Sequence, residues 1–417
     1  MAKRNAALSL TALVLAIAVV IFLLLSRNRF YQNQYNKGKA FIEKQQYHEA
    51  AASFRKATQW KKKSAFAWLG LAQSKYFLKQ YDDALEPVNR SISLDSLISE
   101  AWLYRGMIYA RKNNHADAID NYNTALKLDS LFAQAYYQRG ISRASLGEFR
   151  ASVADYKKAM ALDKDNIEAY LKSIEARSAL EDYRGALGDY DKLLEVDPGN
   201  YDALFNRGYL KVTLGDTKGA IDDLNKAISI RSDDPELFLQ RGVALAKNGD
   251  FSASVKDFTL CIDKKHSLPK VLYNRALSYL HMQKLKEASG DLQELIKIEP
   301  QNANAYYTLG VISSMKQDFK GSIPFYDKAI EYNASFADAY FNRGVSKGNL
   351  DLHKEAIPDY DKAIQLNGQY AEAYYGRAIS KIMYSKFDEG CADLRRALEL
   401  GYMQAQDQIN TYCNKPR

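Results

Sequence analysis

A repeat of 34 residues constrains the fold of this chain more than any other feature. It runs from residue 31 to residue 404 without an insertion or a deletion, and its eleven units begin at residues 31, 65, 99, 133, 167, 201, 235, 269, 303, 337 and 371. A repeat of this length is one supersecondary unit that cannot bury its apolar face alone, so neighbouring units stack on a shared core. The sequence therefore predicts a solenoid, in place of the two or three globular domains that 417 residues would otherwise suggest.

Small and bulky residues occupy fixed slots within each unit. Slot 20 is always small, slot 8 is Gly or Ala in all units but one, and slots 4 and 24 are almost always bulky; the tenth unit carries Tyr340, Gly344, Ala356 and Tyr360 there. At helical spacing, slots 4, 8 and 11 share one stripe, and slots 20, 24 and 27 share another. Small residues let two helices approach while bulky ones fill the space beside them. Each unit is therefore predicted to be a helical hairpin.

Slots 7 and 23 carry a charged pair. Six units have Arg in the first slot and Asp in the second: Arg139 and Asp155, Arg207 and Asp223, Arg241 and Asp257, Arg275 and Asp291, Arg343 and Asp359, and Arg377 and Asp393. We interpret the pair as a partly buried contact between the two helices of a unit. Its predicted role is structural, because removal of one partner would strand the other.

These slots resemble those of the tetratricopeptide-repeat (TPR) family, over about nine-tenths of the chain. The resemblance implies an all-α solenoid of eleven helix-turn-helix units that winds into a right-handed superhelix of roughly one and a half turns. It also implies that the first helix of each unit lines an inner surface, on which partner proteins or extended peptides bind. The carboxylate clamp of chaperone-binding members needs a Lys at slot 5, which this chain lacks in every unit.

Slots 5 and 6 supply the predicted partner-binding residues. The slot 6 amides are similar to the asparagine ladder in the TPR superhelix of O-linked N-acetylglucosamine transferase, where they hold the backbone of an extended peptide; an amide offers both a donor and an acceptor. The ladder is interrupted at Gly70, Tyr104, Lys172, Thr308 and Gly376. The alternative for slot 5 is packing between adjacent first helices. The predicted residues are Asn36, Gln138, Asn206, Gln240, Asn274 and Asn342, with the rings of Tyr137, Phe205, Tyr273, Tyr307, Phe341 and Tyr375.

The N-terminal region is predicted to hold a membrane anchor. After a short basic N-terminus (1–5), Ala6–Leu25 has twenty residues without a charge, enough for a helix of about 30 Å that spans a bilayer core. A cleaved signal peptide is the alternative, but its apolar region is usually shorter and ends in small residues. Residues 26–30 are read as a linker to the first unit.

Positive charge is concentrated behind this segment. Residues 26–80 carry twelve Lys and Arg against two Glu. Such a segment beside an anchor can attract anionic lipid, and the alternative is a solvated basic face. No nucleic-acid partner is expected, since the rest of the solenoid is acidic and no nucleic-acid motif occurs.

The end of the chain is predicted to carry a cap and a disulfide. Gly401 breaks the last repeat helix, and residues 403–413 read as a capping helix before a tail at 414–417. In a hairpin bent at Gly401, Cys391 and Cys413 come nearly opposite, within the reach that a disulfide requires. Cys261 takes a slot that is usually Ala, so it reads as a small core residue. A bridged pair would place the solenoid in an oxidising compartment.

No enzyme signature, metal-site pattern or cofactor motif is found, so no cofactor is expected. The sequence favours a non-catalytic, single-pass membrane scaffold for protein–protein interaction, on the exported (periplasmic) side of a bacterial cell envelope. The alternative is a cytosol-facing receptor with the layout of the mitochondrial outer-membrane import receptor, although the regular units and the missing clamp depart from that family. Charge does not settle the orientation, because Lys3 and Arg4 oppose the basic residues after the anchor.

Overall fold

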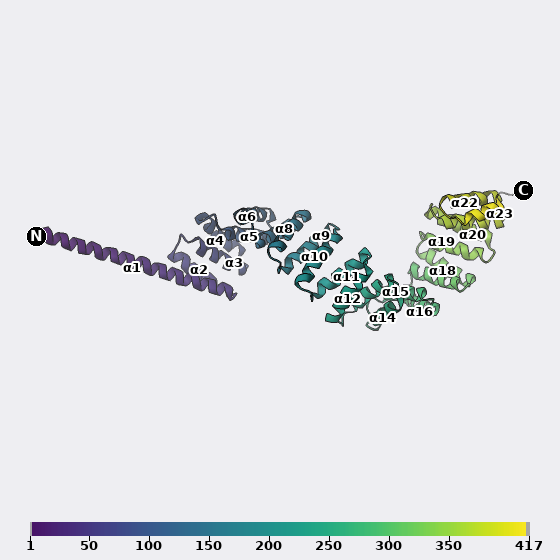
Figure 1. The fold of residues 1–417 in the computed structure, drawn as a ribbon, viewed down its shortest axis with the longest axis horizontal. Coiled ribbons are helices and arrows are strands. Elements are labelled where there is room, and N and C mark those ends of the chain that lie inside the picture. The colour runs from purple at the N-terminus through teal and green to yellow at the C-terminus, as the bar shows by residue number, and fades with distance from the viewer. Residues whose placement is uncertain (1, 414–417) are drawn as a thin grey trace. The chain divides into compact units, whose positions relative to one another are not determined.

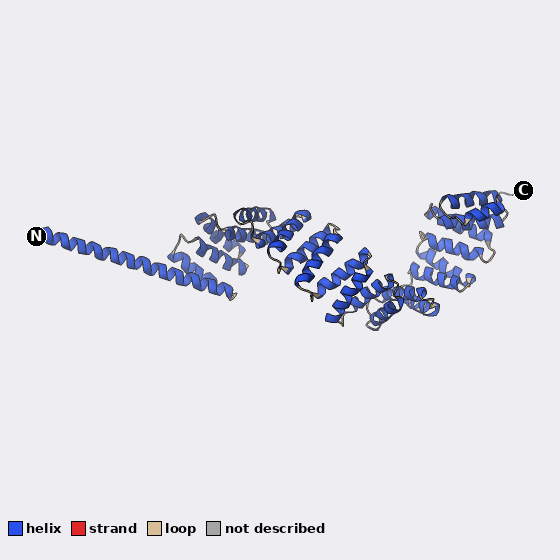
Figure 2. Cartoon of the chain, in the orientation of Figure 1, coloured by secondary structure: helices blue, strands red, loops and turns tan. Residues whose placement is uncertain are grey.

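The computed structural model describes residues 2–413, and within them every regular element is an α-helix (Figures 1 and 2). The predicted tail at 414–417 lies outside the described residues. The helices are α1 (Ala2–Glu43), α2 (Tyr47–Trp60), α3 (Ala65–Phe77), α4 (Tyr81–Leu94), α5 (Ser99–Arg111), α6 (His115–Leu128), α7 (Ala133–Ser145), α8 (Phe149–Leu162), α9 (Ile167–Ala179), α10 (Tyr183–Val196), α11 (Tyr201–Leu214), α12 (Thr217–Ile230), α13 (Pro235–Lys247), α14 (Phe251–Asp263), α15 (Leu268–His281), α16 (Leu285–Ile298), α17 (Ala303–Met315), α18 (Phe319–Tyr332), α19 (Ala337–Gly348), α20 (His353–Leu366), α21 (Ala371–Met383), α22 (Phe387–Glu399) and α23 (Ala405–Tyr412).

The helices form about eleven pairs, followed by α23, which confirms the predicted all-α solenoid. From α3 onward each pair coincides with one 34-residue unit. Successive helices pack against each other from α1 to α10 and from α12 to α23. The chain divides into two compact units, residues 1–203 and 204–417. Each is built from the same hairpin, so the hairpin is the level at which the structure is best explained.

The turn inside every hairpin uses a left-handed residue at slot 15. Glycine takes this conformation at little cost, and it does so at Gly147, Gly215 and Gly249. Non-glycine residues adopt the same conformation in the other units, at Gln45, Lys79, Asn113, Glu181, Gln283, Gln317, Asp351 and Ser385. A backbone hydrogen bond then closes the helix end, as from Gln46 N to Phe41 O at 2.8 Å. The glycine dipeptides of the sequence thus mark only some of the turns.

The core of each hairpin follows the predicted pattern of small and bulky slots. A Cβ added to Gly140 would lie 2.6 Å from the ring of Tyr156, and one added to Gly310 would lie 2.6 Å from the ring of Tyr326. The slot 20 residue of a unit is buried as well; Ala118 of the third unit, for example, has no exposed surface. Slot 8 is therefore small because the slot 24 ring lies directly against its backbone.

The Arg–Asp contact within the hairpin is confirmed. Arg139 donates to both carboxylate oxygens of Asp155 at 2.9 and 2.6 Å, and the Asp side chain is almost fully buried. The pair recurs at Arg207 and Asp223, Arg241 and Asp257, Arg275 and Asp291, Arg343 and Asp359, and Arg377 and Asp393. Such two-pronged pairs fix geometry as well as charge, so they set the register of the two helices.

The same arginine also joins neighbouring units, which the sequence analysis does not anticipate. Its remaining nitrogen donates to a slot 25 side chain of the preceding unit, from Arg139 to Asn123 at 2.7 Å and from Arg343 to Asp327 at 2.6 Å. The arginine therefore holds three helices together.

Two units vary this contact. In the third unit Arg105 donates to the neutral Asn121 at 2.6 Å, and burial lowers the pKa of the arginine. In the seventh unit, by contrast, the hydrogen bond to Asp257 raises the pKa of Arg241. In the fifth unit Ser173 replaces the arginine and donates to Asp189 at 2.6 Å. In these two units slot 7 keeps a hydrogen-bond donor, whereas Leu71 and Leu309 in the second and ninth units have none.

The N-terminal helix α1 is continuous for 42 residues, so the predicted linker at 26–30 is helical (Figure 1). One stretch of it, Leu15–Glu43, is long and apolar enough to cross a membrane by length and composition. Its apolar side chains are exposed, among them Phe22 at 70% and Leu25 at 65%. A core helix would bury these side chains. Their exposure is instead typical of a membrane anchor or a signal sequence.

The C-terminal end has both features that the sequence suggests. Ala405 and Ile409 of α23 are buried in a cluster with Leu394 and Ala397 of α22. A disulfide joins Cys391 to Cys413, whose Cα atoms lie 5.7 Å apart. Cys261 is a buried free thiol, as expected for a small core residue.

Candidate peptide-binding surface

The slot 5 rings are partly buried in the packing between helices. Tyr307 lies 6.0 Å from Tyr326 of its own unit and 4.7 Å from Phe336, measured between ring centroids. Phe341 has the same relation to the rings of Tyr360 and Tyr370, at 6.0 and 4.9 Å. Tyr137 contacts Tyr156 and Tyr375 contacts Tyr402, while Phe205 and Tyr273 are also only partly exposed. These rings therefore support the hairpins and present only an edge to a partner.

The slot 6 amides do not form one uniform ladder. Gln240 is buried and donates to Glu236 at 2.5 Å. Asn274 donates to the backbone oxygen of Lys270 at 2.8 Å, and Asn342 donates to the hydroxyl of Tyr307 at 2.9 Å. Asn36 and Asn206 are exposed, and Gln138 is half-buried. Gln240, Asn274 and Asn342 thus use their amide hydrogens within the protein, the first two at helical spacing.

A cavity of about 380 Å³ lies between α19, α20 and α21. Its walls combine rings with polar groups: Phe341, Val345, Gly348, Asn349, His353, Tyr360, Glu372, Tyr375, Gly376, Ile379, Ser380 and Tyr402. Burial raises the pKa of Tyr375, so this phenol stays neutral at physiological pH. A largely aromatic hollow with a few polar groups at its edge is suited to one side chain of an extended peptide.

A second cavity, of about 220 Å³, occupies the corresponding place between α7, α8 and α9. Both cavities are lined by slots 9, 12, 13, 17 and 24 of one unit and by slots 6, 9 and 10 of the next. In the smaller cavity these residues are Ile141, Ala144, Ser145, Phe149, Tyr156, Lys172, Glu175 and Ala176. The same slots therefore form a cavity in two different units.

The two cavities lie where the amide ladder is interrupted. Slot 6 is Gly376 in the larger cavity and Lys172 in the smaller one. A Cβ at Gly376 would lie 2.7 Å from the Tyr360 ring, so a larger residue would displace that ring. From sequence alone these positions read as interruptions of the ladder. The signal that could have found the larger cavity is a Gly at slot 6 facing Gly348 at slot 12.

Catalytic chemistry has no visible site on this surface. Among the described residues, no group of three or more His, Cys, Asp or Glu could hold a metal ion. Burial raises the pKa of the Cys261 thiol to about 12, so it is a poor nucleophile at neutral pH. The arrangement is able to bind but offers no assembled reaction centre.

Comparison with known families identifies the repeat. Models described as tetratricopeptide repeats or TPR repeats match residues 31–64, 99–130, 133–166, 211–249, 273–338 and 337–370. The chain is a tetratricopeptide-repeat protein. TPR proteins of this kind are typically non-catalytic scaffolds for protein–protein interaction, and the matching models describe repeats only. None of the curated proteins compared with this TPR chain matches it.

Several solved TPR structures are similar to this TPR protein. The Cut9–Hcn1 hetero-tetramer of APC/C is 13% identical, covers 92% of this chain and 96% of its own, and has a TM-score of 0.45. YrrB, described as a TPR protein with an unusual peptide-binding site, is 24% identical over 48% of this chain and 100% of its own, with a TM-score of 0.39. Yeast Tom70 is 14% identical over 93% of this chain and 96% of its own, with a TM-score of 0.42.

Proposed function

We propose that this TPR protein is a single-pass membrane scaffold that holds extended segments of partner proteins in the cavities between its first helices. The observation that carries the proposal is the recurrence of one cavity at the same slots of two different units. A hollow lined by rings and polar groups suits one side chain of an extended chain. An exposed amide at slot 6, such as Asn36, would bind peptide backbone elsewhere on the surface.

The proposed anchor is the apolar part of α1. Its exposed side chains need a nonpolar environment, and the helix is long enough to cross a bilayer before the repeats begin. The bridge between Cys391 and Cys413 supports the exported side, because disulfides persist in oxidising compartments. We therefore favour a periplasmic solenoid in a bacterial cell envelope.

A cytosol-facing receptor is the second candidate. The observation that favours it is the basic character of residues 26–80, because Lys and Arg beside an anchor tend to remain in the cytoplasm. Thiol labelling of the protein in its native membrane separates the two orientations. Cys391 and Cys413 that label only after reduction, together with a C-terminus protected from protease in inside-out vesicles until they are opened, support export. Freely labelled cysteines and an accessible C-terminus would establish the receptor.

The binding surface is tested by closing the cavities at their rims. Ser145 and Asn349 occupy the same slot of their units and are exposed, so S145W and N349W should fill both entrances without disturbing the core. We expect partner capture by the full chain from solubilised membranes to fall at least about 10-fold in the double variant, since a side chain lost from a pocket costs about 1–3 kcal/mol. The matched control is S145A with N349A. Equal capture by both double variants would refute the cavity as the binding site.

The amides are tested separately. Replacement of the exposed Asn36 and the half-buried Gln138 with Ala should weaken partner binding, while stability changes by about 0.5 kcal/mol or less at each position, as for other surface substitutions. If the double variant is markedly less stable but binds normally when folded, these amides are structural and the cavities alone carry recognition.

A further inference from the structure

A basic pocket of about 380 Å³ lies where the apolar stretch of α1 ends. One side is formed by Leu24, Arg27, Asn28 and Tyr31 of α1, and the other by residues 60–63 at the end of α2. Its volume is within the range of small-ligand sites in proteins. Leu24 belongs to the predicted membrane segment, whereas Arg27 is the first charged residue after it. The pocket therefore spans the boundary between apolar and charged chain.

The hairpin fold brings these two sides together. Arg27 Nε donates to the backbone oxygen of Trp60 at 2.6 Å, and the rings of Phe30 and Trp60 stack with centroids 5.3 Å apart. The hydroxyl of Tyr31 shares a hydrogen bond of 2.8 Å with Ser64 Oγ. The loop after α2 is thus held against α1, in a fixed position relative to the end of the apolar stretch.

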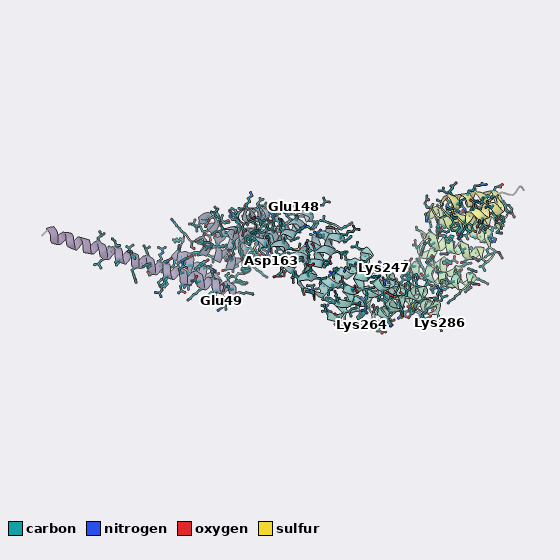
Figure 3. All side chains as sticks on the ribbon, in the orientation of Figure 1. Glu49, Glu148, Asp163, Lys247, Lys264 and Lys286 are labelled. Carbon is teal, nitrogen blue, oxygen red and sulfur yellow. A yellow bond between two sulfur atoms is a disulfide. The ribbon has the colours of Figure 1, made fainter. Side chains whose placement is uncertain are left out.

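The pocket carries positive charge that the described part of the chain leaves unbalanced. None of Arg27, Lys62 and Lys63 forms an ion pair among residues 2–413, and the ammonium of Lys61 lies 4.9 Å from the centre of the Tyr31 ring. Glu49, which lies at the opposite end of this hairpin in Figure 3, is too distant to neutralise them. Four cations around one hollow repel each other, so a bound anion would stabilise the arrangement.

The other units show that the fold does not require these lysines. The slot that Lys61 occupies is acidic or an amide in most other units: Asp95, Asp129, Asp163, Asp197, Glu299, Asn333 and Asn367. In four of them the side-chain oxygen accepts a hydrogen bond from the backbone two residues later, as from Leu97 N to Asp95 at 3.0 Å. The first unit gives up this local contact for three consecutive lysines. Cations at a helix C-terminus gain a little from the helix dipole, but most other units do without them.

We propose that this pocket binds the phosphate group of an anionic phospholipid from the bilayer that surrounds α1. This inference rests on the proposed membrane anchor. Arg27, Lys62 and Lys63 would pair with the phosphate oxygens, because guanidinium and ammonium groups are the preferred donors to phosphate. Trp60 is 41% exposed and Phe30 is 53% exposed, and tryptophan in particular favours the level of lipid headgroups. Leu24 would contact the start of the acyl chain.

The test measures lipid binding by the full chain in zwitterionic detergent micelles, titrated with phosphatidylglycerol and read by native mass spectrometry. Substituting Lys61, Lys62 and Lys63 with Gln should weaken binding by about 10- to 100-fold, because each nearby charge contributes a factor of about five. The matched control substitutes Lys44, Arg55 and Lys56 with Gln, which removes the same charge from exposed positions outside the pocket. We expect the control to lose less than about three-fold. Unchanged helical circular dichroism verifies that both variants fold.

Each other outcome has a definite meaning. Equal losses in the two variants would show diffuse attraction to charge and overturn the pocket. Equal affinity for phosphatidylcholine would exclude recognition of the anionic lipid, and competition by inorganic phosphate at the same concentration would exclude a lipid-specific site. Resistance of the wild-type protein to carbonate extraction tests the anchor independently. A chain that resists extraction but shows no difference between the variants keeps the anchor and refutes the pocket.

Discussion

The first and last hairpins of the solenoid each lack a neighbour on one side, and they meet this problem by different means. The last hairpin, α21–α22, has Arg377 paired with Asp393, a capping helix over its apolar face and a disulfide that fastens the cap. The first hairpin, α1–α2, has Lys37 and Ser53 in place of the ion pair, and its outer rings at Phe30 and Trp60 remain exposed. The C-terminal end is thus closed by the chain itself, whereas the N-terminal end is left for the proposed bilayer and its lipids to complete.

The largest effect should follow from opening the C-terminal closure. Replacing Cys391 with Ala and Cys413 with Ser removes a cross-link between residues 22 apart in sequence, for which the chain-entropy model gives about 3 kcal/mol. Amide hydrogen exchange should show loss of protection in α23 and α22, while α2 keeps its protection. Reduction of the wild-type protein should reproduce the pattern. If α2 loses protection as well, the two ends are not independent and the comparison fails.

A smaller effect is expected at the ion pair that the last hairpin has and the first hairpin lacks. Asp393 accepts hydrogen bonds from Arg377 at 2.8 and 2.6 Å and lies 2.9 Å from Lys381, so D393A would leave two partly buried cations unpaired at a cost of about 2 kcal/mol. D393N should cost less, because the third unit holds Arg105 with Asn121. S53A in the first hairpin should change stability by less than about 0.5 kcal/mol. Urea denaturation of the three variants provides the ranking.

These contacts show what sequence alone can predict. The hairpins, the Arg–Asp pairs and the cysteine pair follow from spacing, because a 34-residue period fixes which slots face each other. The bond from Arg139 to Asn123 could have been read from the polar residues at slot 25, but only once the neighbouring unit was considered. Sequence could not reveal that the amide of Gln240 donates a hydrogen bond to Glu236, or that a cavity lies at Gly376. Both features depend on the positions of side chains. Nor could it show that the three lysines after Trp60 line the same pocket as Arg27.

Alkaline pH should distinguish the first hairpin from the ninth, α17–α18, more weakly. Burial raises the pKa of Tyr326 to about 12, so the folded state holds this proton more tightly than the unfolded chain, whose tyrosine titrates near 10. The resulting stability is complete below pH 10 and is lost as pH rises towards 12. At pH 11 the loss at this position should be about 1 kcal/mol. The first hairpin has Phe54 in the equivalent slot and should lose less, although burial also raises the pKa of Tyr35. Hydrogen exchange of α2 and α18 can compare the two. Y326F should reduce the effect in α18, where burial also raises the pKa of Tyr307.

The smallest effect concerns the turns, where the two ends are alike. Gln45 and Ser385 both adopt left-handed backbone conformations, with φ of 58° and 64°. Q45G and S385G should each raise stability by about 0.5–1 kcal/mol, because glycine relieves the strain of the left-handed turn at some cost in unfolded-chain entropy. Thermal melting of the single and double variants provides the measurement. A gain in stability at one end only would show that the two ends also differ in the backbone strain of their turns.

The unbroken α1 helix has a mechanical consequence for the proposed scaffold. Because α1 continues without a break from the apolar stretch into the first hairpin, a tilt of the part within the bilayer is transmitted to the first repeats. The rotation of the first repeats about the axis of α1 is fixed in the same way, because each residue turns an α-helix by about 100°. One residue inserted between 26 and 30 would rotate the first repeats by roughly a quarter turn about the axis of α1, and an insertion of about seven residues, which adds two turns, would nearly restore the original direction. The direction in which the scaffold presents its first repeats is therefore encoded in the number of residues between the apolar stretch and residue 31.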